Sequence, residues 1–234
     1  MAIAATSTER FTGFPDGGIE FFLELQAEQS RPWFKAHQAD FDRLWKRPLE
    51  LLVTELQSRL SDAYPHLPEV QPHFMRIQRD TRFARDKTPY KTWVAASISS
   101  HPAPSDEDHA TPGLYVSFGL EGDYVGVGAW HLSPAVLTRY RAAVDHARHG
   151  PAIQKIVDGL TAQGYSIESM ETLKRTPAPY PADHPRAELL KRKGLAVGVA
   201  VPDGVTQTPA LLDWAEQHLR QAQPLVAWLD KHLA

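Results

Sequence analysis

The chain has 234 residues, a formal net charge of −3 and no cysteine. The absence of cysteine excludes disulfides, Cys-ligated zinc, iron–sulfur clusters and thiol nucleophiles. The acidic balance argues against a general nucleic-acid coat, which needs a strongly basic domain. No stretch approaches the roughly 18 consecutive apolar residues of a membrane span, and residues 1–10 lack the apolar core of a secretory signal. We therefore expect a cytoplasmic protein without membrane contact, with a flexible N-terminus over residues 1–12 and a single domain over residues 13–234.

The first part of the chain has the spacing of amphipathic helices. Apolar residues recur at helical intervals over residues 18–29 and again from Phe41 to Leu60. Pro48 lies inside the second pattern, where it either kinks the helix or opens a new one at its first turn.

The middle of the chain changes to a period of two. Short segments rich in β-branched and aromatic residues predict strands over residues 73–78, 92–99, 113–120, 124–130 and 195–201. Gly126 and Gly128 share one face of the fourth segment, and such glycines permit the close approach of a backbone or a ligand. Close packing of a helix is the simpler explanation for them.

Helical patterns return after the strands. Ser133-Pro134 and Pro151 begin two helices, and Thr208-Pro209 begins a long C-terminal one. Helices, then strands, then helices indicate an α+β fold, with a mostly antiparallel sheet of about five strands flanked by N-terminal and C-terminal helices.

The run from Phe74 to Trp93 contains six Lys or Arg residues and two Asp. Clustered guanidinium and ammonium groups suit phosphate or carboxylate ligands. We expect direct ligand contacts from four cations of this run, with further groups lining and closing the site. The direct contacts are Arg76, Arg79, Arg82 and Lys87; Tyr90 lines the wall, and Lys91, Lys174 and Arg175 close the site. Alternatively, Asp80 and Asp86 pair internally with Arg82 and Lys87 and simply hold the loop in shape.

A second basic segment covers residues 173–193, with six positive side chains against Asp183 and Glu188. The two segments could form the two walls of one site. The triplet at residues 191–193 is also explained as the solvated end of a short helix, where the helix dipole favours cations.

The motif Arg-Ile-x-Arg-Asp-x-Arg-Phe-x-x-Asp-Lys-x-Pro-Tyr-Lys-Thr spans residues 76–92. Together with Leu-Lys-Arg-x-Pro at 173–177, Asp-His-Pro at 183–185 and Leu-Leu at 189–190, it resembles an uncharacterised bacterial and fungal family, a conserved domain of unknown function. The chain departs from that pattern at Ala178-Pro179, where the family tends to have Lys-Gly. The resemblance implies no established activity and supports the position of the site only.

Three functional hypotheses follow. The first is a cleft that binds a phosphorylated or otherwise anionic small molecule. The second is an enzyme acting on a phosphoester or nucleotide-like substrate, with Asp80 or Asp86 as base and His184 as acid. The third is a nucleic-acid contact surface, whose affinity would fall steeply with salt. We expect no cofactor and no metal, because the sequence has neither a glycine-rich phosphate loop nor a His-Glu-x-x-His array.

Overall fold

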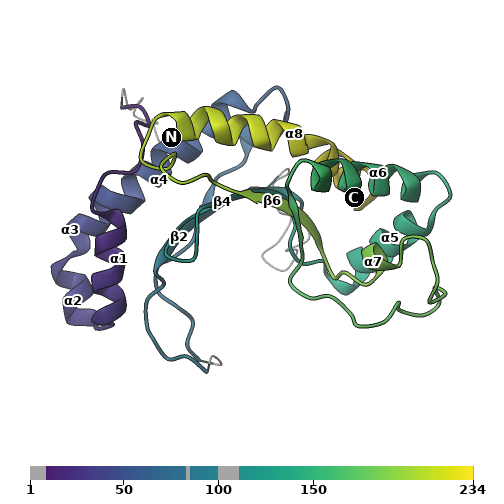
Figure 1. The fold of residues 1–234 in the computed structure, drawn as a ribbon, viewed down its shortest axis with the longest axis horizontal. Coiled ribbons are helices and arrows are strands. Elements are labelled where there is room, and N and C mark those ends of the chain that lie inside the picture. The colour runs from purple at the N-terminus through teal and green to yellow at the C-terminus, as the bar shows by residue number, and fades with distance from the viewer. Residues whose placement is uncertain (1–8, 83–84, 100–110, 234) are drawn as a thin grey trace.

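The computed structural model describes residues 9–82, 85–99 and 111–233. It confirms the α+β fold, with helices at both ends of one open antiparallel sheet of six strands (Figure 1). The elements in chain order are α1 (Gly18–Ala27), α2 (Arg31–Ala36), α3 (Gln38–Phe41), the π-helical turn η1 (Asp42–Lys46), α4 (Arg47–Arg59), the 3₁₀ turn η2 (Leu67–Glu69), β1 (His73–Phe74), β2 (Trp93–Ser99), β3 (Gly113–Gly119), β4 (Tyr124–Ala129), α5 (Pro134–Asp145), α6 (His149–Ala162), β5 (Ser166–Glu168), α7 (Ala187–Leu190), β6 (Leu195–Ala200) and α8 (Ala210–Leu233).

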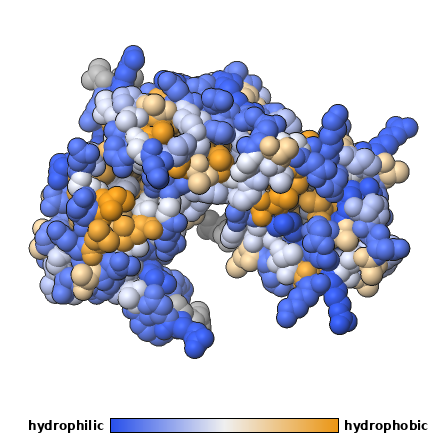
Figure 2. All heavy atoms as spheres, in the orientation of Figure 1, coloured by the Kyte–Doolittle hydropathy of each residue, from blue (hydrophilic) through white to orange (hydrophobic). Residues whose placement is uncertain are grey.

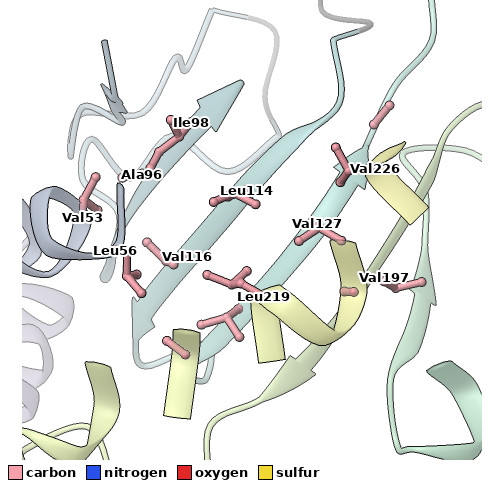
Figure 3. Close-up of a cluster of buried hydrophobic side chains, with 14 of the residues drawn as sticks. Val53, Leu56, Ala96, Ile98, Leu114, Val116, Val127, Val197, Leu219 and Val226 are labelled. Atoms are coloured by element: carbon pink, nitrogen blue, oxygen red, sulfur yellow. The ribbon is translucent and has the colours of Figure 1, made fainter. Parts of the chain in front are cut away.

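The strand order in the sheet is β1-β2-β3-β4-β6-β5. Ala96, Val116, Val125 and Val199 lie side by side across four of these strands, so one face of the sheet is apolar. Helices α4 and α8 cover this face. Figure 3 shows Val53 and Leu56 of α4 with Leu219 and Val226 of α8, which pack with the strand side chains to form the central core.

The opposite face of the sheet is polar and carries small side chains. Ser97, Tyr115, Ser117 and Tyr124 point to this side and are only half-buried. Figure 2 shows a hollow between the lobe of α1–α3 and the lobe of α5–α7, on the side of the sheet away from α8. Among the described residues, the sheet is therefore covered by helices on one face and open between two lobes on the other.

A tyrosine, not a helix, lies against Gly126 and Gly198 on the open face, while Gly128 has a φ of +127° and lies against the backbone of Leu195 and Ala196. The Tyr124 ring lies along the sheet, and a Cβ atom added at Gly126 or Gly198 would collide with it. Helix α8 lies against β4 on the other face. The expected close packing of a helix on Gly126 is therefore wrong, because the missing Cβ atoms make room for an aromatic side chain of the same sheet.

Pro48 lies at the start of a helix, as one of the two predicted alternatives required. The π-helical turn η1 leads directly into α4, whose first turn contains Pro48. The helical run is continuous there, since the Arg47 amide donates to the Asp42 carbonyl, and the proline follows directly on the π-helical distortion. Trp45 of the π-helical turn donates its indole N–H to the carbonyl of Gly18 at 3.0 Å, which ties α1 to this bend.

Two strand predictions need correction. Only His73 and Phe74 of the predicted strand 73–78 pair with β2 as a strand. Residues 75–92 form a hairpin whose ends stay bonded to the sheet, through the Met75 amide and the Thr92 carbonyl. A sixth strand, β5, was missed because three residues are too few to establish a period. It pairs with β6 and forms the edge opposite β1.

Candidate functional site

The basic motif forms a hairpin at the β1 edge of the sheet, which we call the 75–92 hairpin. Its two arms are held by backbone bonds, from the Lys91 amide to the Ile77 carbonyl at 2.8 Å and from the Arg79 amide to the Pro89 carbonyl at 2.8 Å. Between these bonds Gln78 pairs with Tyr90 as an isolated bridge. The hairpin descends beside the lobe of α1–α3 (Figure 1). Phe83 of the motif lies outside the described residues.

Most charges of the hairpin are paired within it. The Arg79 guanidinium lies 2.7 Å from the Asp86 carboxylate. The Thr88 amide and hydroxyl also donate to Asp86, and together with Arg79 they lower its pKa. Arg82 binds Asp80 through its side chain, at 2.7 Å, and through its backbone amide. These contacts lower the pKa of Asp80 to about 2. The Asp80–Arg82 pair matches the loop-holding alternative, whereas Asp86 binds Arg79 and not the expected Lys87.

Two more predicted ligand contacts are engaged inside the fold. The Lys87 ammonium donates to the backbone carbonyl of Thr81 at 2.8 Å. Tyr90 does not line a cleft wall, because its ring is buried and stacks on Phe34 with 4.5 Å between centroids. The Gln29 side chain accepts the Tyr90 N–H and donates to the Tyr90 carbonyl, which fixes the hairpin to the connection between α1 and α2.

Arg76 and Lys91, unlike Arg79 and Arg82, form no ion pair with any carboxylate of the described residues. The Lys91 ammonium lies 4.5 Å from the centre of the Trp93 ring. Burial lowers the pKa of Lys91, and the positive charges of Arg76 and Arg79 lower it further. The base of the hairpin therefore concentrates positive charge beside an aromatic wall.

The second basic segment lies at the other edge of the sheet. It follows β5, which is five strand positions from β1, and this separation corresponds to roughly 24 Å along the sheet. Lys174 and Arg175 are exposed there. The expectation that the two segments form the walls of one compact site is therefore wrong, because the order of the strands places them on opposite edges.

Both sequence motifs fall within one family match. Residues 18–228 match the family described as "Conserved hypothetical protein (DUF2461)". The chain belongs to this family. The comparisons with curated proteins and with solved structures gave no match.

The Asp-His-Pro segment at residues 183–185 does not supply an acid to the hairpin. His184 is buried, and its Nε2 lies 3.1 Å from the Asp145 carboxylate. Its Nδ1 accepts the backbone N–H of Arg186 at 3.0 Å, so both ring nitrogens are occupied. Asp80 and Asp86 lie at the opposite edge of the sheet. The predicted acid–base set is therefore not assembled.

In the rest of the second segment, the lysines bind acidic side chains. Arg192 of this segment and Arg141 of α5 form no ion pair with a described carboxylate. Lys191 binds Glu188 at 2.5 Å and Lys193 binds Glu171 at 2.8 Å. Arg192 is half-buried rather than a solvated helix end, and Arg141 of α5 lies against the same segment. No sequence pattern indicates Arg141, because it lies in an ordinary amphipathic helix.

Histidines do not form a metal centre in the ranges that the structure covers, where no three His, Asp or Glu side chains are placed to hold an ion. His146 and His149 stack with 4.0 Å between ring centres. None of the described helices is both long and apolar enough to cross a membrane.

Proposed function

We propose that this protein binds a phosphorylated or otherwise anionic small molecule at the base of the 75–92 hairpin, with Arg76 and Lys91 as the direct contacts. One observation carries the proposal: Lys91 is partly buried beside two arginines and has no carboxylate partner among the described residues. Like charges that are crowded and partly desolvated disfavour one another. An anion bound between them would remove that repulsion, which is why such clusters are frequent at binding sites.

In this proposal fewer residues contact the ligand than the sequence predicted. Arg79, Arg82 and Lys87 already bind groups of the hairpin, so in this proposal they shape it and do not contact the ligand. Trp93 supplies a flat wall under Lys91. Lys174 and Arg175 take no part, because they belong to the opposite edge of the sheet.

The proposal is tested by thermal unfolding in a panel of anions that includes inorganic phosphate, pyrophosphate and phosphomonoesters. A ligand that binds only the folded protein raises the unfolding temperature by mass action. We expect at least one anion to raise it in the wild type, and Arg76→Gln and Lys91→Met to abolish the shift. Arg82→Gln is the matched control, since it removes one exposed and already paired cation from the same hairpin. Equal loss in all three variants, or no shift in the wild type, would refute the proposal.

The enzyme hypothesis has less support, because no described carboxylate and histidine lie together at the hairpin. Asp80 and Asp86 are held by arginines, and a carboxylate with a lowered pKa is a poor proton acceptor. The same panel addresses it, since turnover of a phosphomonoester would appear as released phosphate.

A further inference from the structure

Three histidine rings stack at the corner where α5 ends, α6 begins and α8 ends (Figure 1). The His146 ring lies 4.0 Å from the His149 ring, and the His149 ring lies 4.2 Å from the His232 ring, measured between ring centres. The Trp228 ring lies 4.7 Å from His232, and its indole N–H donates to the His149 carbonyl at 3.2 Å. These four side chains therefore connect the last turns of α8 to the first turn of α6.

The His146 ring also caps α6. Its Nδ1 accepts the backbone N–H of Arg148 at 3.1 Å and that of His149 at 3.4 Å. The first amides of a helix have no intrahelical partner, so this nitrogen does what a side-chain oxygen does at other helix starts. An imidazole nitrogen accepts a hydrogen bond only without a proton, and the charged ring donates from both nitrogens. The cap therefore requires a neutral His146.

The charges within and beside the stack oppose protonation of His149 and His232. Burial lowers the pKa of both rings, and the positive charges of the other stacked histidines and of Lys231 lower each pKa further. Arg148 adds to this effect on His149. His149 also lies at the start of α6, where the helix dipole disfavours a cation, whereas His232 lies in the last turn of α8, where the dipole favours one. A proton on His232 therefore places its charge against the His149 ring.

The acids near this corner have other partners. Asp145 lies against His184 at 3.1 Å, and a proton on His184 would strengthen that contact. The charge of Asp230 acts on Tyr64. Arg186 adds a further cation, which donates to the Asp145 carbonyl. Within residues 9–82, 85–99 and 111–233, no carboxylate forms an ion pair with the three stacked histidines, so positive charge in the stack has no counter-ion there.

We infer that His146, His149 and His232 form a proton-sensitive latch, which holds the end of α8 against the start of α6 while the imidazoles are neutral and releases it on acidification. A proton on His146 removes the cap of α6, and a second charge in the stack would lie against the first. Trp228 and Leu233 are buried in the closed latch and become accessible when it opens. The latch shares no residue with the 75–92 hairpin, so it is independent of the function proposed there.

The direction of the pH effect follows from the lowered pKa values. His149 and His232 bind protons less readily in the closed latch than at their ordinary pKa of 6.5. Protons therefore bind the open form preferentially. The stabilisation supplied by the closed latch is complete above 6.5 and is lost as the pH falls through the lowered values.

The test is backbone hydrogen exchange at about pH 7.5 and about pH 5.5, on either side of the ordinary histidine pKa, with each rate corrected for its intrinsic pH dependence. We expect protection in the first turn of α6 and the last turns of α8 to fall about fivefold or more at the lower pH, the usual effect of losing a helix cap. Amides of β3 and β4 serve as the internal reference and should keep their protection.

A triple variant identifies the groups responsible. His149→Phe and His232→Phe keep aromatic rings in the stack without a titrating nitrogen, and His146→Asn keeps an acceptor for the α6 amides. Protection of α6 and α8 in this variant should be equal at the two pH values. Equal protection in the wild type, or a loss that persists unchanged in the triple variant, would overturn the inference.

A second measurement needs no variant, so it decides the question even if the triple variant does not fold. The ring C–H signals of the wild type are followed by NMR against pH. His149 and His232 should titrate below 6.5 and over a broad range, because a proton on one ring opposes a proton on the next. Two independent titrations at the ordinary pKa would show that the stack does not sense protons.

Discussion

At the scale of single residues, the cations of the 75–92 hairpin divide by their partners. Arg79 and Arg82 bind carboxylates of the same hairpin, whereas Arg76 and Lys91 adjoin other cations. The sequence could not make this division, because Asp80 and Asp86 stand within a few residues of several cations. Only the turn geometry decides which cation each carboxylate meets. Both sequence hypotheses therefore describe part of the hairpin.

This division predicts opposite effects on stability. Arg79→Gln should lower the free energy of unfolding, because it removes a bond to Asp86 and another to Thr88. Arg76→Gln should leave it unchanged or raise it by up to about 0.5 kcal/mol, the usual range for a surface substitution, because it relieves repulsion on Lys91. Urea denaturation of the two variants makes the comparison. A clear loss of stability in Arg76→Gln would show that Arg76 is also structural.

Lys91 predicts a dependence on alkaline pH. Its pKa is lower in the folded chain than its ordinary value of 10.5. At pH values between the lowered pKa of the folded chain and the ordinary pKa of the unfolded chain, the unfolded chain binds more protons than the folded one. The Lys91 contribution to stability therefore rises with pH in this interval. Binding of an anion should weaken over the same interval, as the ammonium loses its proton. Denaturation series on wild type and Lys91→Met isolate this contribution as their difference, and an identical pH profile in both proteins would contradict it.

Asp80 predicts a dependence on acidic pH. Arg82 holds the pKa of Asp80 at about 2, below its ordinary value of 3.8. The contribution of this carboxylate to hairpin order is therefore complete above about 4 and is lost as the pH falls through about 2. Carboxyl-carbon NMR should find Asp80 titrating near 2 in the wild type and closer to 3.8 in Arg82→Gln. An unshifted pKa in that variant would refute the assignment of Arg82 as the main cause.

At the scale of elements, the open face of the sheet is built around Tyr124. Gly198 lies directly under its ring, and the backbone there is not in the left-handed region, so added bulk alone decides the effect of a substitution. Burial raises the pKa of the Tyr124 hydroxyl. Tyr115 lies beside it with 6.3 Å between ring centres. The two rings therefore form part of the floor between the lobes.

We predict that Gly198→Ala destabilises the wild type by about 1–3 kcal/mol, the range for overpacking. In a Tyr124→Ala background the same substitution should be neutral or stabilising, because alanine restricts the unfolded chain more than glycine does. A double-mutant cycle by chemical denaturation measures the coupling. If the cost of Gly198→Ala is equal in both backgrounds, the ring is not what excludes the methyl group.

The elements themselves were largely predictable, and the exceptions have physical causes. The long helices and β2, β3, β4 and β6 follow from their periods of 3.6 and two. The strand predicted over 73–78 is short, because the hairpin bonds of Ile77 and Arg79 take its second half away from β2. The role of Gly126 depended on a ring from its own strand and on Gly198, about 70 residues later in the sequence. Contacts of that kind are set by register, which local patterns do not contain.

At the scale of the whole molecule, the order of the strands separates the two basic segments that look equivalent in sequence. The chain enters the sheet at the β1 edge and places β5 at the other, so the two basic segments lie at opposite edges of the sheet. The separation of the two basic segments could not be predicted from composition, because the net charge of −3 is a sum over the whole chain. Anion binding is thus expected at one edge of the sheet and not in one cleft between the two segments.

This separation makes a last prediction. Sites more than about 10 Å apart without shared partners contribute independently to stability, so Arg76→Gln and Arg141→Gln should have additive effects on the free energy of unfolding, within about 0.5 kcal/mol. An anion that binds the hairpin should bind Arg141→Gln as tightly as the wild type, because the closest link between the edges is the rigid sheet. Denaturation of the double variant and calorimetric titration of the single ones supply both measurements. Strong coupling in either experiment would mean that the lobes move together across the open face, and that one larger ligand spans both groups of cations.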